Sequence, residues 1–228
     1  MEVPCFKCNH TTTLKVNFEV ISFACPNCGA VYKNSNGAGL KLERSFSGYD
    51  FTNKLAIGQQ GLFFDQTYTI TGVLIKEYQG FEWAEYMLQG TDTDGFGYLS
   101  EADGHWIFLE EIEFKQSVGN HPKTIEYEDL TLNLYEYYSP KLIAASGYFD
   151  FDILQKTQLI EYINPPFVLS AEKTGKVETV FLGKHIAKTE VKKAFGITNL
   201  PTKIGTGLVQ PFYLTFAIWP LYFARWLY

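Results

Sequence analysis

The sequence predicts a mainly β protein with a zinc ribbon at its N-terminus, and three observations point to this class. All four cysteines of the 228 residues lie between Cys5 and Cys28, in two Cys-x-x-Cys pairs. Aromatic residues make up 17% of the chain, and such residues favour strands together with Val, Ile and Thr. From about Leu55 onward, turn-forming residues recur every eight to twelve positions, which is typical of antiparallel barrels and sandwiches.

The cysteine spacing predicts a structural zinc site. Cys5 and Cys8 form one pair, Cys25 and Cys28 form the other, and sixteen residues separate the pairs. Two such knuckles direct four thiolates at one ion and complete a closed tetrahedron, which leaves no position for a substrate. Two disulfides are the alternative. They need an oxidising compartment, and the first residues show neither the basic region nor the apolar stretch of a secretory signal.

The remaining chain is expected to form two similar β units. Apolar and polar residues alternate from Leu14 to Val20, which predicts a strand between the two cysteine pairs. The expected organisation is a ribbon at 1–35, a linker at 36–54, a double β domain at 55–204 and a hydrophobic segment at 205–228. Within the double domain we expect antiparallel barrel or sandwich units at about 55–120 and 125–186, followed by a short helix at 189–195, which Thr189 can cap and Gly196 can end.

A weak internal repeat supports the two units. Trp83-Ala84-Glu85-Tyr86 recurs as Leu159-Ile160-Glu161-Tyr162, and Leu99-Ser100-Glu101 recurs more loosely as Leu169-Ser170-Ala171-Glu172. The repeat would place Glu85 and Glu161 at equivalent positions, and Glu101 and Glu172 likewise. If the repeat is genuine, two related β units pack side by side.

Charge and hydropathy indicate which partners and which cellular location to expect. A net charge of −6 argues against a general nucleic-acid-binding surface, although zinc ribbons often bind nucleic acid. Residues 204–224 contain no charged side chain, and aromatic residues within and after this segment suit a membrane interface. Lysines precede it at positions 188, 192, 193 and 203, so we expect a cytoplasmic protein associated with the inner face of the membrane. The segment could begin a membrane region, lie in the membrane interface or form a buried terminal helix of a soluble domain; the first two are forms of membrane association.

The order of several short motifs resembles that of a bacterial domain family of unknown function, DUF4178. The matching pieces begin with Ile57-Gly58 and run to about Phe212; no single piece is diagnostic, but their order is specific. The resemblance implies no established reaction and suggests a role related to the cell envelope. The residues that carry it and serve as candidate site residues are Trp83, Glu85, Tyr86, Glu101, Trp106, Glu161, Tyr162, Pro165, Pro166 and Glu172.

Each of these candidates also has a structural interpretation. Trp83 and Trp106 could form an aromatic ligand surface, but a place in the core is the simpler explanation. Paired glutamates can do acid–base chemistry, but a glutamate beside a tyrosine on a strand is more often solvated. Pro165-Pro166 is expected to be a rigid turn between strands. We therefore predict no catalytic residue.

Three functions compete. The first is a non-enzymatic interaction or scaffold module at the membrane, with a role in envelope stress, that recognises a protein or a lipid headgroup. The second is a hydrolase-type enzyme that uses carboxylates in a groove between the β units. The third is nucleic-acid binding through the ribbon. The enzyme hypothesis requires some of the four glutamates to converge in a cleft with raised carboxylate pKa values.

Overall fold

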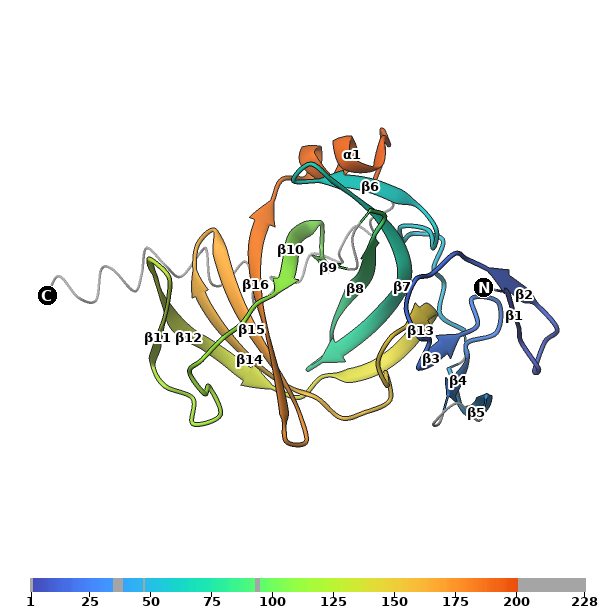
Figure 1. Ribbon diagram of the computed structural model, residues 1–228, viewed down its shortest axis with the longest axis horizontal. Coiled ribbons are helices and arrows are strands. Elements are labelled where there is room, and N and C mark those ends of the chain that lie inside the picture. Colours follow the sequence, from blue (N-terminus) through green and yellow to red (C-terminus); the bar gives the residue numbers. More distant parts are fainter. Residues whose placement is uncertain (1, 35–38, 47, 93–94, 201–228) are drawn as a thin grey trace, which may run out of the picture.

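A long antiparallel sheet organises the chain (Figure 1). The computed structural model describes residues 2–34, 39–46, 48–92 and 95–200. Fourteen strands form this sheet, in the order β11-β12-β14-β15-β16-β10-β9-β8-β7-β13-β3-β4-β5 with β6 paired to β7. The mainly β, antiparallel class is confirmed. The sheet is not closed into a barrel, and the two expected units are parts of this one sheet instead of separate barrels.

Each of the two expected units contains four long consecutive strands, together with shorter or additional ones. The first run is β7 (Gln66–Tyr78), β8 (Phe81–Gly90), β9 (Phe96–Ala102) and β10 (His105–Glu111). The second run is β13 (Lys141–Phe149), β14 (Gln158–Asn164), β15 (Phe167–Thr174) and β16 (Val177–Ile186). A shorter pair, β11 (Thr124–Tyr127) and β12 (Leu130–Tyr138), lies at one edge, where β12 pairs with β14. Because β13 pairs with β7 instead of β14, the second run is split across the sheet.

The strand register supports the internal repeat in part. Glu85 of β8 pairs with Ser100, and Glu161 of β14 pairs with Ser170, so the two glutamates occupy equivalent positions. Glu101 pairs with Ala84 of β8. In the second repeat the residue equivalent to Ala84 is Ile160, and Ile160 pairs with Ala171. Glu101 is therefore equivalent to Ala171, and the expected match with Glu172 is wrong by one residue. A shift of one residue moves a side chain to the other face of a sheet.

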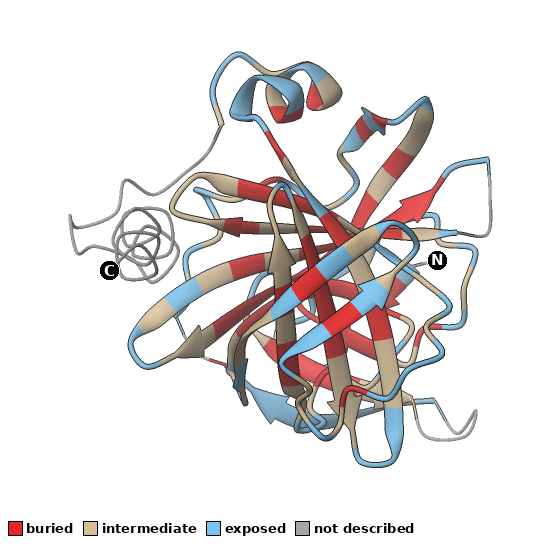
Figure 2. Ribbon diagram, turned by 90° about the vertical axis from the view of Figure 1, so that its left-hand side faces the viewer, coloured by how far each residue is buried: buried red, intermediate tan, exposed pale blue. Residues whose placement is uncertain are grey.

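Two of the four hydrophobic clusters of the described residues are built on alternate residues of the sheet strands. Alternate residues of β7 to β10 pack under the loop that contains Tyr49 and Phe51 and under the single described helix. Alternate residues of β14 to β16 pack with Ile125 of β11 and with Val118 of the preceding loop. The strands in Figure 2 accordingly show buried residues alternating with less buried ones. The residues that face the other way line a cavity, and some of them, such as Leu74 and Met87, also belong to a further hydrophobic cluster.

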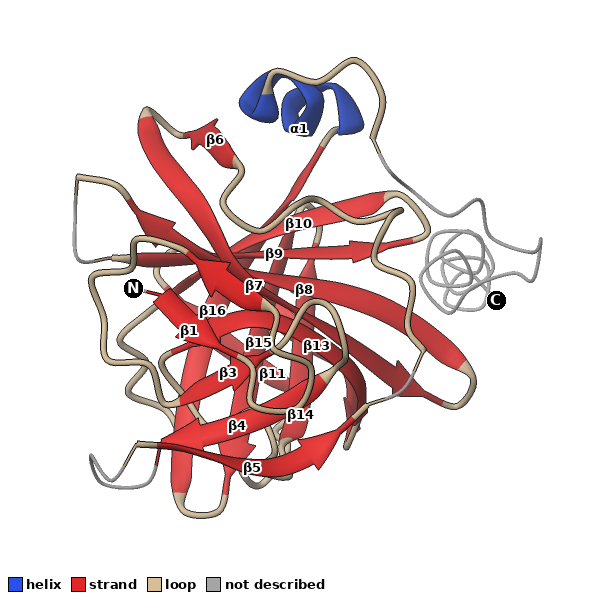
Figure 3. Cartoon of the chain, turned by 90° about the vertical axis from the view of Figure 1, so that its right-hand side faces the viewer, coloured by secondary structure: helices blue, strands red, loops and turns tan. Residues whose placement is uncertain are grey.

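The N-terminal unit extends the large sheet with three strands, β3 (Ser22–Ala24), β4 (Ala30–Asn34) and β5 (Leu40–Ser45). The hairpin of β1 (Glu2–Pro4) and β2 (Thr11–Thr13) precedes them and forms a separate two-stranded sheet. Figure 3 shows β3, β4 and β5 at the end of the molecule remote from the helix. β3 pairs with β13, with Tyr148 opposite Phe23. The segment expected to be a linker contains β5 and, after it, two aromatic residues that pack against the core of β7 to β10.

The strand predicted between the cysteine pairs is absent. Residues 14–20 have no strand structure, although Leu14, Val16, Phe18 and Val20 pack against the N-terminal core as their apolarity suggested. The backbone of this segment is held by a side chain, since the N–H of Asn17 donates to Oε1 of Gln89 on β8 at 3.1 Å. The packing of these four apolar side chains and the hydrogen bond of Asn17 therefore fix residues 14–20, although the segment forms no strand.

The predicted helix is present as α1 (Lys188–Phe195), and it covers β6 (Gln60–Phe63). Val191 and Phe195 are buried, and Gly196 ends the helix in the left-handed conformation with a φ of 63°. The helix begins one residue earlier than predicted, and Glu190 accepts a hydrogen bond from the N–H of Ala187 at 2.7 Å, so Thr189 is not the cap. No helix in the described part of the chain is long and apolar enough to cross a membrane. The hydrophobic segment at 205–228 lies outside the described residues.

Candidate functional site

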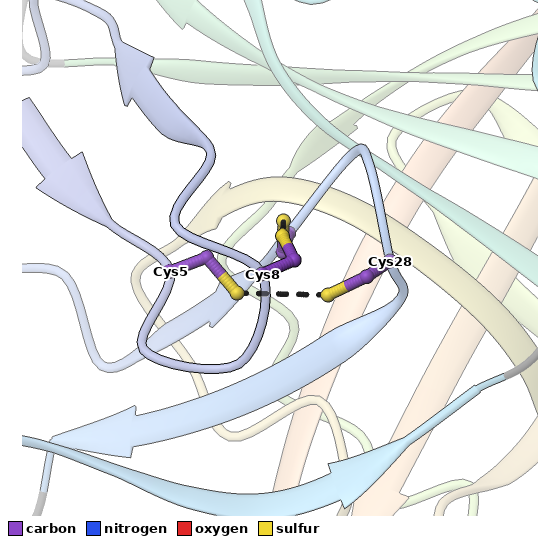
Figure 4. Close-up of side chains that lie close together, drawn as sticks. Cys5, Cys8 and Cys28 are labelled. Carbon is purple, nitrogen blue, oxygen red and sulfur yellow. Dashed lines mark hydrogen bonds between the residues drawn. The ribbon is translucent and has the colours of Figure 1, made fainter.

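Four cysteines meet at the N-terminal end of the molecule. Cys5 and Cys8 follow β1, and Cys25 and Cys28 lie in the turn between β3 and β4, so each pair is positioned by its own strands (Figure 4). All four sulfur atoms lie within 4.8 Å of one another. The pairing of strands thus brings together two motifs that are separate in the sequence. His10, which follows the first pair, is exposed and does not belong to the cluster.

The distances suit a tetrahedral metal ion. The Sγ atoms of Cys5 and Cys28 are 3.5 Å apart, and those of Cys8 and Cys25 are 3.7 Å apart. Four sulfur atoms about 2.3 Å from a central zinc ion would be separated from one another by about 3.8 Å. All four cysteines are free thiols in the structure. The residues present therefore fit a metal with thiolate ligands.

Hydrogen bonds around the cluster support thiolates. The Tyr32 hydroxyl lies 3.3 Å from Sγ of Cys5 and accepts the N–H of Lys7 at 3.0 Å. Burial alone would raise the pKa of Cys5, but hydrogen bonds from Tyr32 and the backbone lower it to about 6. Burial raises the pKa of Cys25 to about 12, so this thiol needs a cation nearby to ionise. A metal ion bound by the four sulfur atoms would supply that charge.

A second candidate site is a cavity of about 840 Å³. It lies against the face of strands β7 to β10 that is opposite to the core under the helix. On β8 the lining residues include Trp83, Glu85 and Met87, whereas Ala84 lies in the core; Tyr86 belongs to the core and also borders the cavity. Residues of β7, β9, β10, β12, β13, β14, β15 and β16 complete the walls. A cavity of this size accommodates a small organic ligand.

A buried lysine organises the carboxylates on one wall. Lys76 of β7 is 7% exposed, and its Nζ lies 2.6 Å from Oε2 of Glu85 and 3.3 Å from Oε1 of Glu172. Burial alone would lower the pKa of Lys76, but Glu172 and Glu85 raise it, so the lysine is charged. The indole N–H of Trp83 donates to Oε1 of Glu85 at 2.7 Å. Glu85, Glu172 and Trp83 therefore meet at one ion-pair cluster.

Glu161 faces the same cavity beside a second carboxylate. It pairs across the strands with Glu136 of β12, and both line the cavity. Burial raises the pKa of Glu161 to about 7, and the charge of Glu136 adds to the shift, while a hydrogen bond from Tyr138 opposes it. Glu85 also raises this pKa and Lys76 lowers it. Burial likewise raises the pKa of Glu136.

The raised pKa of Glu161 predicts how stability depends on pH. Because this pKa is about 7, and the pKa of an unfolded glutamate is about 4.3, the folded state binds more protons between these values. The stabilisation from protonated Glu161 is therefore present at low pH and lost as the pH rises through 7. Relative to Glu161→Gln, the unfolding free energy of the wild type should fall by roughly 2 kcal/mol between pH 5 and pH 8.

Urea unfolding at pH 5, 6, 7 and 8 checks this prediction. Glu113→Gln, at an exposed position of the loop after β10, serves as the matched control and should run parallel to the wild type. Parallel curves for Glu161→Gln and the wild type would contradict the assigned pKa.

The other candidate residues have structural positions. Tyr86 and Trp106 stack at 6.2 Å in the core beneath the helix, and the hydroxyl of Tyr86 accepts the N–H of Leu55 at 3.3 Å. Glu101 is 3% exposed; it binds Lys54 at 2.9 Å and accepts the N–H of Gly104 at 2.8 Å. It therefore fixes a loop and a turn and does not join the cavity cluster.

The second half provides two further structural positions. Tyr162 is fully buried in the core formed by β14 to β16. Pro165 and Pro166 form the turn between β14 and β15, as predicted, and the peptide bond between them is cis.

Among the cavity residues that the sequence did not indicate, Lys76, Glu136 and Tyr138 bear on its chemistry. One signal for Lys76 was available, because a lysine follows the apolar run Val73-Leu74-Ile75 in a strand that is buried on both faces. Such a lysine needs an acidic partner, and the period of two places it on the face of Leu74. No comparable signal pointed to Glu136, whose role depends on the pairing of β12 with β14.

Fold and site together define a mainly β protein with a thiolate cluster suited to a metal and a polar cavity on its sheet. A family model described as "Domain of unknown function (DUF4178)" matches residues 56–188. Because the match covers more than half of the chain, the protein belongs to the DUF4178 family, as the sequence motifs indicated. The match includes the cavity strands from β7 to β16 and excludes the four cysteines. Comparisons with curated proteins and with solved structures gave no match.

Proposed function

We propose that this protein binds a small molecule in the cavity of the sheet and that its four cysteines hold a structural zinc ion. The observation that carries the binding function is the cavity of about 840 Å³ into which Lys76, Glu85, Glu161 and Glu172 converge. Apolar walls with a few convergent polar groups and perturbed pKa values are typical of ligand sites. This role is non-enzymatic, like the first hypothesis from the sequence, but its partner is a small molecule, whereas the sequence led us to expect a protein or a lipid headgroup.

The choice of zinc follows from the ligand set. Four thiolates in two knuckles are the usual donors of a structural zinc site, and they leave no coordination position open. The zinc would hold the loop after β1 against the turn between β3 and β4. Its chemical contribution would be confined to that cross-link.

Fragment binding tests the cavity. Saturation-transfer NMR with a fixed panel of aromatic fragments, carrying positive, neutral or negative groups, should detect binding to the wild type. Ser170→Phe should abolish this binding, because Ser170 is 7% exposed and lines the cavity. Thr131→Phe, at an exposed position of β12, is the matched control and should bind like the wild type. Fragments that bind Ser170→Phe as well as the wild type would overturn the assignment.

Acid–base catalysis is a second candidate, and the pKa of Glu161 at about 7 favours it. Three of the four glutamates named in the sequence converge in the cavity, which is the arrangement that the hydrolase hypothesis requires. A group that titrates near neutral pH can both accept and donate a proton during turnover. Conversion of a bound fragment that stops in Glu161→Gln, detected by mass spectrometry, would favour catalysis over binding alone.

The membrane-associated scaffold with a role in envelope stress stays a proposal from the sequence. It depends on the uncharged segment at 204–224 and on lysines that precede it.

A further inference from the structure

The charges that line the cavity are strongly unbalanced. Among the described residues, Lys76 is the lining side chain with a positive charge, and Glu85 and Glu172 already neutralise it. Glu136, Glu161 and Asp150 also line the cavity without a lysine or arginine bound to them in the described structure. The cavity therefore carries excess negative potential.

Two of these carboxylates lie directly opposite each other. Glu136 and Glu161 are register partners on β12 and β14, and both face the cavity. Side chains in such a pair have Cβ atoms about 5 Å apart, and like charges there are destabilising. A cation between the two carboxylates would turn this repulsion into two attractive contacts. The pair is thus a place where a positively charged group is favoured.

Asp150 gives an independent indication. Its Oδ1 atom is buried and has no hydrogen-bond partner in the described structure, although Asp150 lines the cavity. A buried carboxylate oxygen without a donor is costly, and such an atom in a cavity wall indicates that a donor is supplied by a ligand or by water. A ligand that donates hydrogen bonds would satisfy it.

Aromatic rings adjoin the glutamate pair. Tyr138 hydrogen-bonds to Glu161, stacks on Tyr78 at 4.8 Å and meets Trp83 edge-on at 6.0 Å. All three rings line the cavity. Aromatic faces attract organic cations and pack against apolar bodies, so they complement the carboxylates. The rings and the carboxylates of this wall would together suit a ligand that has a positively charged group attached to an apolar group.

We propose that the cavity binds an organic amine whose ammonium group lies between Glu136 and Glu161 and whose apolar part packs against Trp83, Tyr78 and Tyr138. This inference rests on the proposed binding function and specifies the chemical class of the ligand. It predicts discrimination by charge among ligands of the same shape.

Three indoles of similar shape make the test: tryptamine is cationic, tryptophol is neutral and indole-3-acetate is anionic. Isothermal titration calorimetry of the full chain at pH 8, where Glu161 is ionised, should show tryptamine binding at least tenfold more tightly than the other two. Glu136→Gln and Glu161→Gln should each weaken tryptamine binding by about tenfold, the effect of losing one charge-assisted contact, and should leave tryptophol binding unchanged. Glu113→Gln, outside the cavity, is the matched control.

The outcomes separate the ligand class from the binding function. Equal or tighter binding of tryptophol or indole-3-acetate, abolished by Ser170→Phe, would overturn the amine proposal while the cavity function stands. Tryptamine binding that survives Ser170→Phe and both glutamine variants would place the amine elsewhere and overturn the proposal. Absence of tryptamine binding to the wild type would overturn it as well. Circular dichroism of each variant establishes that loss of binding does not reflect loss of the fold.

Discussion

Cys25→Ser is expected to abolish binding of the proposed zinc ion and to lower the melting temperature by about 10 °C, the largest effect anticipated for a single substitution in this chain. Cys25 is 1% exposed, and it lies at the centre of the core that joins the loop after β1 to β3 and β4. Serine is a poor zinc ligand, so three thiolates would remain in a buried site without a full tetrahedron. Metal analysis of freshly purified protein and differential scanning calorimetry measure the two effects.

The structure also predicts how far this damage spreads. From the sequence, the loss would be confined to residues 1–35. β3 pairs with β13, however, and the N–H of Ile153 donates to the hydroxyl of Ser22 at 3.3 Å, so the N-terminal strands support β13 within the large sheet. Hydrogen exchange should therefore accelerate at residues 147–153 as well as at 22–34. His10→Ala, outside the sulfur cluster, should retain zinc. Full zinc occupancy in Cys25→Ser would refute the site.

Lys76→Met is expected to lower the free energy of unfolding by about 3 kcal/mol, because it leaves Glu85 and Glu172 without their cation. Breaking a buried ion pair by removing one partner costs more than replacing the entire group with neutral residues. The triple variant Lys76→Met, Glu85→Gln, Glu172→Gln should therefore recover much of the loss. Urea unfolding at pH 7 measures each variant.

A matched control is available on the adjacent strand. Lys141→Met lies at an exposed position of β13, where it pairs with Glu77 of β7, and it should change the unfolding free energy by less than about 0.5 kcal/mol. An equal effect of Lys141→Met and Lys76→Met would show that the buried ion pairs do not stabilise the sheet. A triple variant as unstable as Lys76→Met alone would show that lost packing of the lysine, and not unpaired charge, causes the effect.

The sequence predicted those features that depend on local spacing. Two Cys-x-x-Cys knuckles require only short turns, so the cluster of four sulfur atoms could be predicted before its strands were known. The equivalence of Glu85 and Glu161 was also predictable, because each precedes a tyrosine in the same local motif and the period of two places both on one face. The helix followed from Val191 and Phe195, which lie on one side of a short turn-bounded segment.

Features that depend on pairing between distant strands could not be predicted. A shift of one residue between the two repeats put Glu101 in the core-facing position and Glu172 in the cavity. Trp106 was indistinguishable from Trp83 in the sequence, yet one is buried in the core and the other lines the cavity. The Glu136–Glu161 pair exists because β12, and not β13, lies beside β14. No local pattern encodes that choice.

The pairing of β3 with β13 has a consequence for the order of assembly during synthesis. The cysteine pairs are complete within the first 28 residues, but Phe23 meets Tyr148 across the sheet, more than a hundred residues later. Chains are made at about 5–20 residues per second, and contacts between distant segments form late. We therefore expect the nascent N-terminus to capture its metal while the ribosome is still producing the strands on which it will dock. The metal-bound N-terminus would then be folded before β13 is made and would provide β3 as its partner. In a cell short of zinc, chains would accumulate in which β13 lacks this partner.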